Sequence, residues 1–147
     1  MIAIGSDHGG FSLKQAVLKY LEENGIEFED YGTFDENSCD YPDMAAAPCA
    51  AVISGKADKA LLFCGTGMGV SIAANKYCGI RAAVCSDTFS SRYSRLHNNA
   101  NVLCLGGRVV GAGLGIELVD VFLNTEFEGG RHQVRVDKIS SIEKSRG

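Results

Sequence analysis

The chain has 147 residues, of which 46% are hydrophobic and 22% charged, and its formal net charge is −4. This length suits one domain with its own core, so we expect a single domain over residues 1–147. The acidic balance offers no basic footprint for nucleic acid, and no window approaches the roughly 20 consecutive apolar residues of a membrane span. The first residues lack the basic and apolar regions of a secretory signal, which favours a cytoplasmic location.

The first half of the chain alternates strands with helices. Residues 1–5 are typical of a short strand, and residues 11–24 place apolar side chains at helical spacing. Residues 26–31 alternate apolar with acidic side chains, as a half-buried strand does. The Ala-rich residues 41–53 favour a helix, which Pro48 should kink or divide because proline lacks the N–H of a helical hydrogen bond.

The second half continues this alternation, with three more strands and three more helices: strand 59–64, helix 70–77, strand 81–85, a helix opening near Asp87, strand 101–105 and helix 113–124. Since each crossover helix must pack back onto the sheet, the pattern predicts an α/β fold, a doubly wound five-stranded parallel sheet with helices on both faces. Residues 126–147 are too apolar for a disordered tail, and no further predicted strand follows them. We expect a last helix there that docks on a partner subunit.

Polar or glycine-rich clusters directly follow four of the predicted strands, at residues 6–10, 64–69, 86–87 and 106–108. In an open parallel sheet, ligands bind at the carboxyl ends of the strands. We therefore expect the functional residues at that edge.

The turn from Cys64 to Gly69 has alternating glycines before a helix, so several backbone N–H groups could point at one anion. A tight strand-to-helix turn without any ligand would look the same. No Gly-Lys-Ser/Thr follows, and Val70 stands where the dinucleotide fingerprint has Gly or Ala. The sequence thus disfavours nucleotide binding.

Cys64 lies at a strand end facing a helix N-terminus, where a thiolate is stabilised and can act as a base or a nucleophile. The alternative is a buried structural cysteine, which we expect for most of the six. They are scattered through apolar runs without short paired spacing, and we expect them to be reduced: Cys39, Cys49, Cys64, Cys78, Cys85 and Cys104.

Two histidines and two arginines are further candidates. His8 and His97 fall after a strand and at a helix end, where an imidazole can carry protons or simply cap a helix. Arg131 and Arg135 lie four apart and would share a helical face. Such a pair can grip a phosphate, or it can be part of a solvated basic face.

Five clusters together resemble the ribose-5-phosphate isomerase B family, in its order and spacing and over the full chain. They are Gly5-Ser-Asp-His-Gly-Gly10, Asp40-Tyr-Pro42, Cys64-Gly-Thr-Gly-Met-Gly69 running into Ile72-Ala-Ala-Asn-Lys76, Ser94-Arg-Leu-His-Asn-Asn99 with Asn101-Val102, and Gly129-Gly-Arg-His-Gln-Val-Arg135. The resemblance implies an aldose–ketose isomerase acting on a sugar phosphate with no metal and no cofactor. It also implies a homodimer, or a dimer of dimers, whose active sites are shared between subunits.

Members of this family use one of two bases, a cysteine at the end of the third strand or a glutamate directly after the last glycine of the turn. Cys64 and Val70 place this chain in the cysteine group. The resemblance implies that ribose 5-phosphate and ribulose 5-phosphate interconvert through an enediolate. It implies catalytic roles for Cys64, His97, Thr66 and Asp7, substrate and oxyanion binding by Gly65, Gly67, Met68, Gly69, Asn98 and Tyr41, and phosphate binding by His8, Arg131, Arg135 and Arg108.

Two alternatives remain open from sequence. A hexose-phosphate isomerase acting on allose 6-phosphate or galactose 6-phosphate would use the same proton-transfer groups with a longer pocket. A noncatalytic flavodoxin-like binding module would share the fold. That module predicts a bound chromophore or nucleotide and indifference to thiol alkylation.

Overall fold

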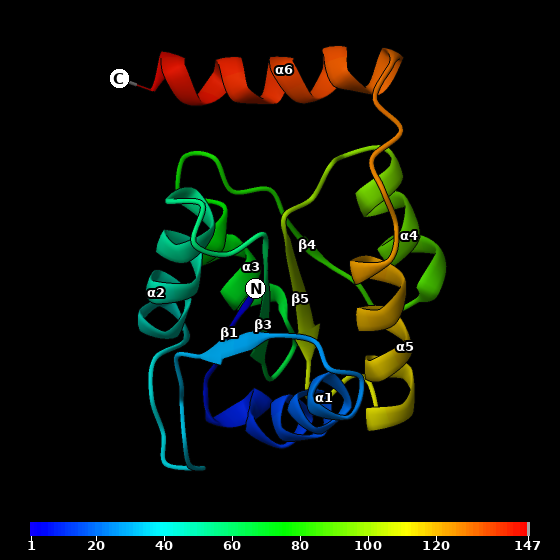
Figure 1. Cartoon of the computed structure of the whole chain (residues 1–147). Helices are drawn as coiled ribbons and strands as arrows, with labels where there is room; N and C mark the ends of the chain where they lie inside the picture. The colour runs from blue at the N-terminus through cyan, green and yellow to red at the C-terminus, as the bar shows by residue number, and fades with distance from the viewer. Residues whose placement is uncertain (147) are drawn as a thin grey trace.

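A computed structural model describes residues 1–146 as a five-stranded parallel sheet between two layers of helices (Figure 1). The strand order is β2-β1-β3-β5-β4, and every neighbouring pair is parallel. The predicted fold class is therefore confirmed, while Gly147, at the end of the predicted domain, lies outside the described residues. The elements in chain order are β1 (Ile2–Ser6), the short 3₁₀ helix η1 (His8–Gly10), α1 (Phe11–Glu23), β2 (Phe28–Asp30), α2 (Tyr41–Ile53), β3 (Lys59–Cys64), α3 (Met68–Ala74), β4 (Ala82–Val84), α4 (Thr88–Leu96), β5 (Val102–Gly106), α5 (Ala112–Leu123) and α6 (Arg131–Ser145).

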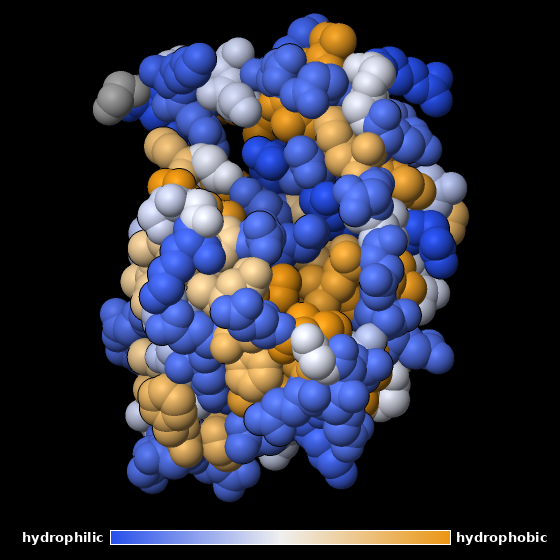
Figure 2. Space-filling model, in the orientation of Figure 1, coloured by the Kyte–Doolittle hydropathy of each residue, from blue (hydrophilic) through white to orange (hydrophobic). Residues whose placement is uncertain are grey.

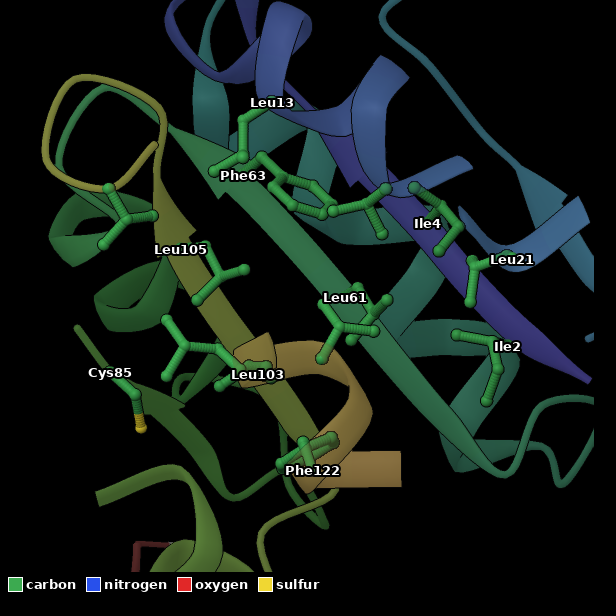
Figure 3. Close-up of a cluster of buried hydrophobic side chains, with 14 of the residues drawn as sticks. Ile2, Ile4, Leu13, Leu21, Leu61, Phe63, Cys85, Leu103, Leu105 and Phe122 are labelled. Atoms are coloured by element: carbon green, nitrogen blue, oxygen red, sulfur yellow. The ribbon is translucent and has the colours of Figure 1, made fainter. Parts of the chain in front are cut away.

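Alternate side chains of the central strands point into two separate cores, because successive residues of a strand face opposite sides of the sheet. Ile4, Leu61 and Leu103 face the side covered by α1 and α5, and Figure 3 shows this cluster with Leu13 from α1. The opposite face packs against α2 and α3, and the residues of the central strands on that side include Ala3, Ala60, Leu62, Cys64, Val102 and Cys104. Cys64 thus belongs to the α2 and α3 side.

Pro48 does not divide the helix over residues 41–53, which was one of the two outcomes expected from the sequence, a kink being the other. The helix α2 runs unbroken from Tyr41 to Ile53, with Pro48 buried inside it. Gly5 of β1 leaves room for the turn of α2 between Met44 and Pro48, which packs directly against it. A Cβ at position 5 would lie 2.5 Å from the Met44 carbonyl oxygen and 2.8 Å from Pro48 Cγ. Tertiary packing therefore outweighs the local preference of proline.

The other elements follow the sequence expectations with small shifts at their ends. The largest shift concerns the helix expected over residues 70–77, which forms over Met68–Ala74 instead. Gly67 has φ of +80° and lies directly before this helix, so the glycine turn ends earlier than the apolar pattern suggests. The last predicted helix exists as α6.

The topology puts a reversal of strand order and one helix at opposite edges of the sheet. From β1 the chain moves outward to β2 and then crosses back to β3 on the other side of β1. This reversal is the point at which open α/β sheets bind ligands, beyond the carboxyl ends of the strands. The helix α6 crosses the opposite edge, beyond the strand starts (Figure 1). Among residues 1–146, no helix combines the length and hydropathy needed to cross a membrane.

Candidate active site

Glycines bring three chain segments into direct contact at the carboxyl edge of the sheet. A Cβ at Gly9 would lie 3.0 Å from the Gly65 nitrogen, and one at Gly106 would lie 2.6 Å from the Thr66 carbonyl carbon. The Gly107 N–H donates to the Cys64 carbonyl oxygen at 2.8 Å. The segments that follow β1, β3 and β5 are thus packed together. We call this group the strand-end cluster: Asp7, His8, Tyr41, Cys64, Thr66 and Arg108 with the turn over residues 65–69.

Cys64 ends β3 and is 4% exposed. Its Sγ accepts a hydrogen bond from the Gly67 N–H at 3.1 Å. A donor at this distance stabilises negative charge on sulfur, as a nucleophilic or basic thiol requires. Only glycine suits position 67, because φ is +80° and a Cβ would lie 2.9 Å from Val84 Cγ2.

Two further residues of the strand-end cluster, Thr66 and Tyr41, are exposed and ordered by local contacts. The Thr66 hydroxyl accepts the Met68 N–H at 3.2 Å. The Tyr41 ring lies against Gly69, where a Cβ would be 2.7 Å from the ring carbon Cζ. The first residue of α2 therefore covers the start of α3 beside the turn.

Asp7 and His8 leave β1 with defined hydrogen bonds. Asp7 is buried, and its Oδ1 accepts the N–H groups of Gly9 and Gly10 at 2.8 and 3.2 Å, which caps η1. His8 Nδ1 accepts the Cys39 N–H at 3.2 Å. A neutral imidazole that accepts at Nδ1 carries its proton on Nε2. His8 can therefore donate to an anion from Nε2.

Arg108 joins the strand-end cluster from the segment after β5. Its backbone N–H donates to the Gly65 carbonyl oxygen at 3.0 Å, and its Nη1 would lie 3.2 Å from a Cβ at position 65. Its exposed guanidinium lies over the start of the glycine turn. A positive charge at this place suits an anionic substrate.

The remaining predicted site residues form a second group at the other edge of the sheet. His97 follows α4, and α6 supplies Arg131 and Arg135, both exposed. Together with Asn98 they line a pocket of about 320 Å³. We call these four residues the α6 cluster.

The two clusters do not meet within one chain. Asn98 lies shortly before the start of β5 at Val102, whereas Arg108 lies just after its end at Gly106. Parallel strands rise about 3.3 Å per residue, so the two edges are roughly 15 Å apart. In Figure 1, α6 lies beyond the start of β5, and the arrowhead of β5 points away from it. A shared active site would have to be built from two chains.

Comparison with known proteins matches the family model described as Ribose/Galactose Isomerase to residues 2–139. Ribose-5-phosphate isomerase B of Escherichia coli (strain K12) is 50% identical over 145 residues, which covers 99% of this chain and 97% of that protein. The chain belongs to the ribose/galactose isomerase family.

Solved structures of this ribose/galactose isomerase family agree with the fold in detail. Ribose-5-phosphate isomerase B of Clostridium thermocellum has a TM-score of 0.98 at 51% identity, with 99% of each chain covered. The enzyme of Mycoplasma genitalium, whose structure contains bound ribulose-5-phosphate, has a TM-score of 0.92 at 42% identity. This match covers 97% of the present chain and 95% of the Mycoplasma genitalium chain.

Sequence analysis missed one acidic neighbour of the α6 cluster in this family member. Glu128 precedes α6, and its Oε2 lies 3.2 Å from His132 Nε2 and 3.9 Å from His97 Nε2. No motif or periodicity marks Glu128, because it lies in the irregular segment between α5 and α6. Its spacing of four from His132 is the one signal that could have been read.

Proposed function

We propose that the protein is an aldose–ketose isomerase that interconverts ribose 5-phosphate and ribulose 5-phosphate, with Cys64 as the base. The observation that carries this proposal is the Cys64 sulfur itself. It lies at the end of β3, where the strand order reverses beside β1, and accepts the Gly67 N–H, in a chain half identical to a ribose-5-phosphate isomerase B.

The proton transfer follows from the residues around the sulfur. The Cys64 thiolate removes the proton from C2 of the open-chain aldose, and the electron pair moves to form a cis-enediolate. The proton of the C2 hydroxyl moves to O1, and the thiol then returns the abstracted proton to C1, which leaves a hydroxyl on C1 and a ketone at C2. Negative charge on the substrate oxygen needs N–H donors. Gly67 and Met68 already donate within the turn, so we assign this task to the amides of Gly65 and Gly69.

Ribose 5-phosphate is mostly a closed furanose, so its ring must open first. We assign this step to His97, which accepts the proton of the anomeric hydroxyl and donates one to the ring oxygen as the bond from C1 to that oxygen breaks. Asp7 and Thr66 orient sugar hydroxyls, with Asn98 and Tyr41 lining the site. All these steps use acid–base groups of the chain, and the proposal includes no cofactor.

The phosphate would be held by four cationic or N–H donor groups from both clusters, His8, Arg108, Arg131 and Arg135. Arginine binds phosphate through paired, charge-assisted hydrogen bonds. The strand-end cluster and the α6 cluster lie at opposite edges of the sheet, so we propose a homodimer or a dimer of dimers. In it, the α6 cluster of one subunit completes the strand-end cluster of the other. The proposal includes a cytoplasmic location, where phosphorylated sugars are made.

Cys64→Ala tests the base. Turnover of ribose 5-phosphate should fall by about a thousandfold, as for other lost acid–base groups, while the thermal melt stays close to that of the wild type. Cys49→Ala is the matched control, because it also removes a buried thiol from the α2 and α3 core. Near-normal turnover by Cys64→Ala would refute the proposed base.

Arg135→Ala tests the phosphate contact and the choice of sugar. Losing one charge-assisted hydrogen bond costs about 1.5–3 kcal/mol, so KM for ribose 5-phosphate should rise about tenfold or more, with little change for free ribose. Lys138→Ala removes one positive charge elsewhere on α6 and should change neither KM. Equal changes for both sugars would contradict the assignment. Higher wild-type kcat/KM on galactose 6-phosphate or allose 6-phosphate would favour the hexose alternative.

A further inference from the structure

His132 has no task in the proposed chemistry, yet it is in closest contact with the proposed ring-opening group. It lies in the first turn of α6 and is 8% exposed. Its ring stacks on the ring of His97, with 3.9 Å between centroids and 12° between planes. A polar ring this buried normally has a hydrogen-bond partner. His132 Nε2 makes no such bond among the described residues; its contacts are the stacked His97 ring and the Glu128 carboxylate, whose Oε2 lies 3.2 Å away.

His97 is held from a second side by α4. Tyr93, one turn earlier, meets the His97 ring edge-on at 4.7 Å and 83°. Tyr93 in turn stacks on Phe89, with centroids 4.3 Å apart. A row of rings thus runs along α4 from Phe89 to His97, and His132 of α6 is the last ring in the row. The His97 ring is confined between Tyr93 and His132, although its side chain is partly exposed.

Glu128 lies beside both imidazoles. Its Oε2 is 3.2 Å from His132 Nε2 and 3.9 Å from His97 Nε2, and its backbone N–H donates to the Leu96 carbonyl at 3.1 Å. The ligand atoms of the three side chains lie within 4.8 Å of one another, but the stacking of the two rings does not suit one shared metal ion. Nearly parallel rings 3.9 Å apart cannot both place one ion in their planes, as coordination through nitrogen lone pairs requires.

We propose that His132 is a positioning residue, whose stacked ring holds the His97 imidazole in the orientation from which it opens the sugar ring. This inference rests on the proposed function. Misplacing a catalytic group by about 1 Å can cost a hundredfold in rate, and a group exposed at one edge needs neighbours that restrict its rotation. The stack with His132 covers one face of the His97 ring.

The groups around His132 favour its neutral form. Burial lowers the pKa of His132, the neighbouring His97, Arg131 and Arg135 lower it further, and Glu128 opposes them. His132 is therefore neutral near pH 7. A neutral ring stacked on His97 tolerates a proton on the latter, whereas two charged rings at this distance would repel each other.

The test compares His132→Phe, which keeps a stacked ring without titratable nitrogens, with His132→Ala, which removes the ring. We expect kcat for ribose 5-phosphate to fall at least tenfold in His132→Ala and less than threefold in His132→Phe. Inhibition by inorganic phosphate should stay within twofold in both, because the arginines remain. In NMR spectra, the ring-current shift of the His97 Hε1 proton should disappear in His132→Ala and persist in His132→Phe. Val136→Ala, on the same buried face of α6, controls for general loosening of the helix.

A double-mutant cycle asks whether His132 acts through His97. In a His97→Ala background, His132→Ala should lower kcat less than twofold. A full kcat in His132→Ala, an equal loss in His132→Phe, or additive losses in the cycle would each overturn the inference. If the wild type turns over no aldose phosphate at all, the proposed function fails instead. The Hε1 shift then still reports whether His132 holds the ring.

Discussion

The buried thiols of this protein differ in what surrounds each sulfur. Burial raises the pKa of Cys49 to about 11 and, with the charge of Asp87, that of Cys85 to about 11. Both therefore stay protonated near neutral pH and behave as small apolar side chains. The Cys64 sulfur instead accepts the Gly67 N–H at 3.1 Å. One backbone donor in the glycine turn thus distinguishes the proposed base from the structural cysteines.

These raised pKa values predict a loss of stability in alkali. Thiols in the unfolded chain ionise near pH 9, and Cys49 and Cys85 in the folded chain only near 11. The unfolded state therefore loses protons first, so the stabilising difference is intact below about pH 9 and declines up to pH 11. A Cys49→Ala/Cys85→Ala variant should show a flatter decline of unfolding free energy between these pH values, measured by urea denaturation. Cys78→Ala, at an exposed thiol, is the control; identical slopes in all three proteins would contradict this account.

A buried ion pair connects two elements at the β2 edge of the sheet. Lys14 of α1 is fully buried, and its Nζ lies 3.0 and 2.8 Å from the two carboxylate oxygens of Asp30 at the end of β2. The same Nζ donates to the Thr33 carbonyl. It thereby fixes the start of the segment that leads to Cys39, whose N–H orients His8. An element far from Cys64 in sequence thus supports the candidate phosphate site.

Lys14→Ala should lower the unfolding free energy by about 3 kcal/mol, because it leaves the partly buried Asp30 carboxylate without its partner. Lys14→Met/Asp30→Asn removes both charges, and Asn can still accept the Gly32 N–H that Asp30 Oδ1 accepts at 2.9 Å. This double variant should recover part of the loss. Urea denaturation at fixed protein concentration measures both, and a double variant less stable than Lys14→Ala would disprove the assignment of the cost to the unpaired charge.

On the scale of the whole molecule, the sheet separates the two halves of the proposed site. The α6 helix is held against its own chain at its far end, where Glu143 accepts the Gly79 N–H at 3.0 and 3.1 Å. A hollow of about 400 Å³ remains beneath it, lined by Ile139 and Ile142, and Figure 2 shows apolar surface under this helix. The helix therefore stays at the amino edge of the sheet, and under the proposed function the missing half of the site would come from a second chain.

Mixing two inactive variants tests this arrangement. Cys64→Ala lacks the base and His97→Ala lacks the ring-opening group, so each homodimer should be nearly inactive. In a statistical mixture, half of the dimers are hybrids, and each hybrid has one site with both groups intact. Turnover should recover to about a quarter of the wild-type value after co-refolding. No recovery, with hybrids detected by mass spectrometry, would place both groups in one chain's site.

Much of the fold and about half of the site geometry could be predicted from sequence. Alternating apolar runs determine the parallel sheet and its two helical layers, because a strand buried on both faces leaves few other arrangements. The polar residues after β1, β3 and β5 could be grouped by the same rule, since parallel strands end at one edge. Their chemical roles stay predictions for the experiments above.

Local patterns by themselves determined the elements of this protein and the types of residue at the strand ends. Only the tertiary structure decided which groups meet. It kept α2 whole at Pro48 through contact with Gly5, paired Lys14 with Asp30, and stacked His132 on His97 beside Glu128. It also separated His97 from Cys64 across the sheet. The physical reason is the distance along the chain over which each feature is determined. Periodicity is local and reports which side of an element is buried. These contacts join side chains from different elements, so their partners depend on the packing of the whole chain.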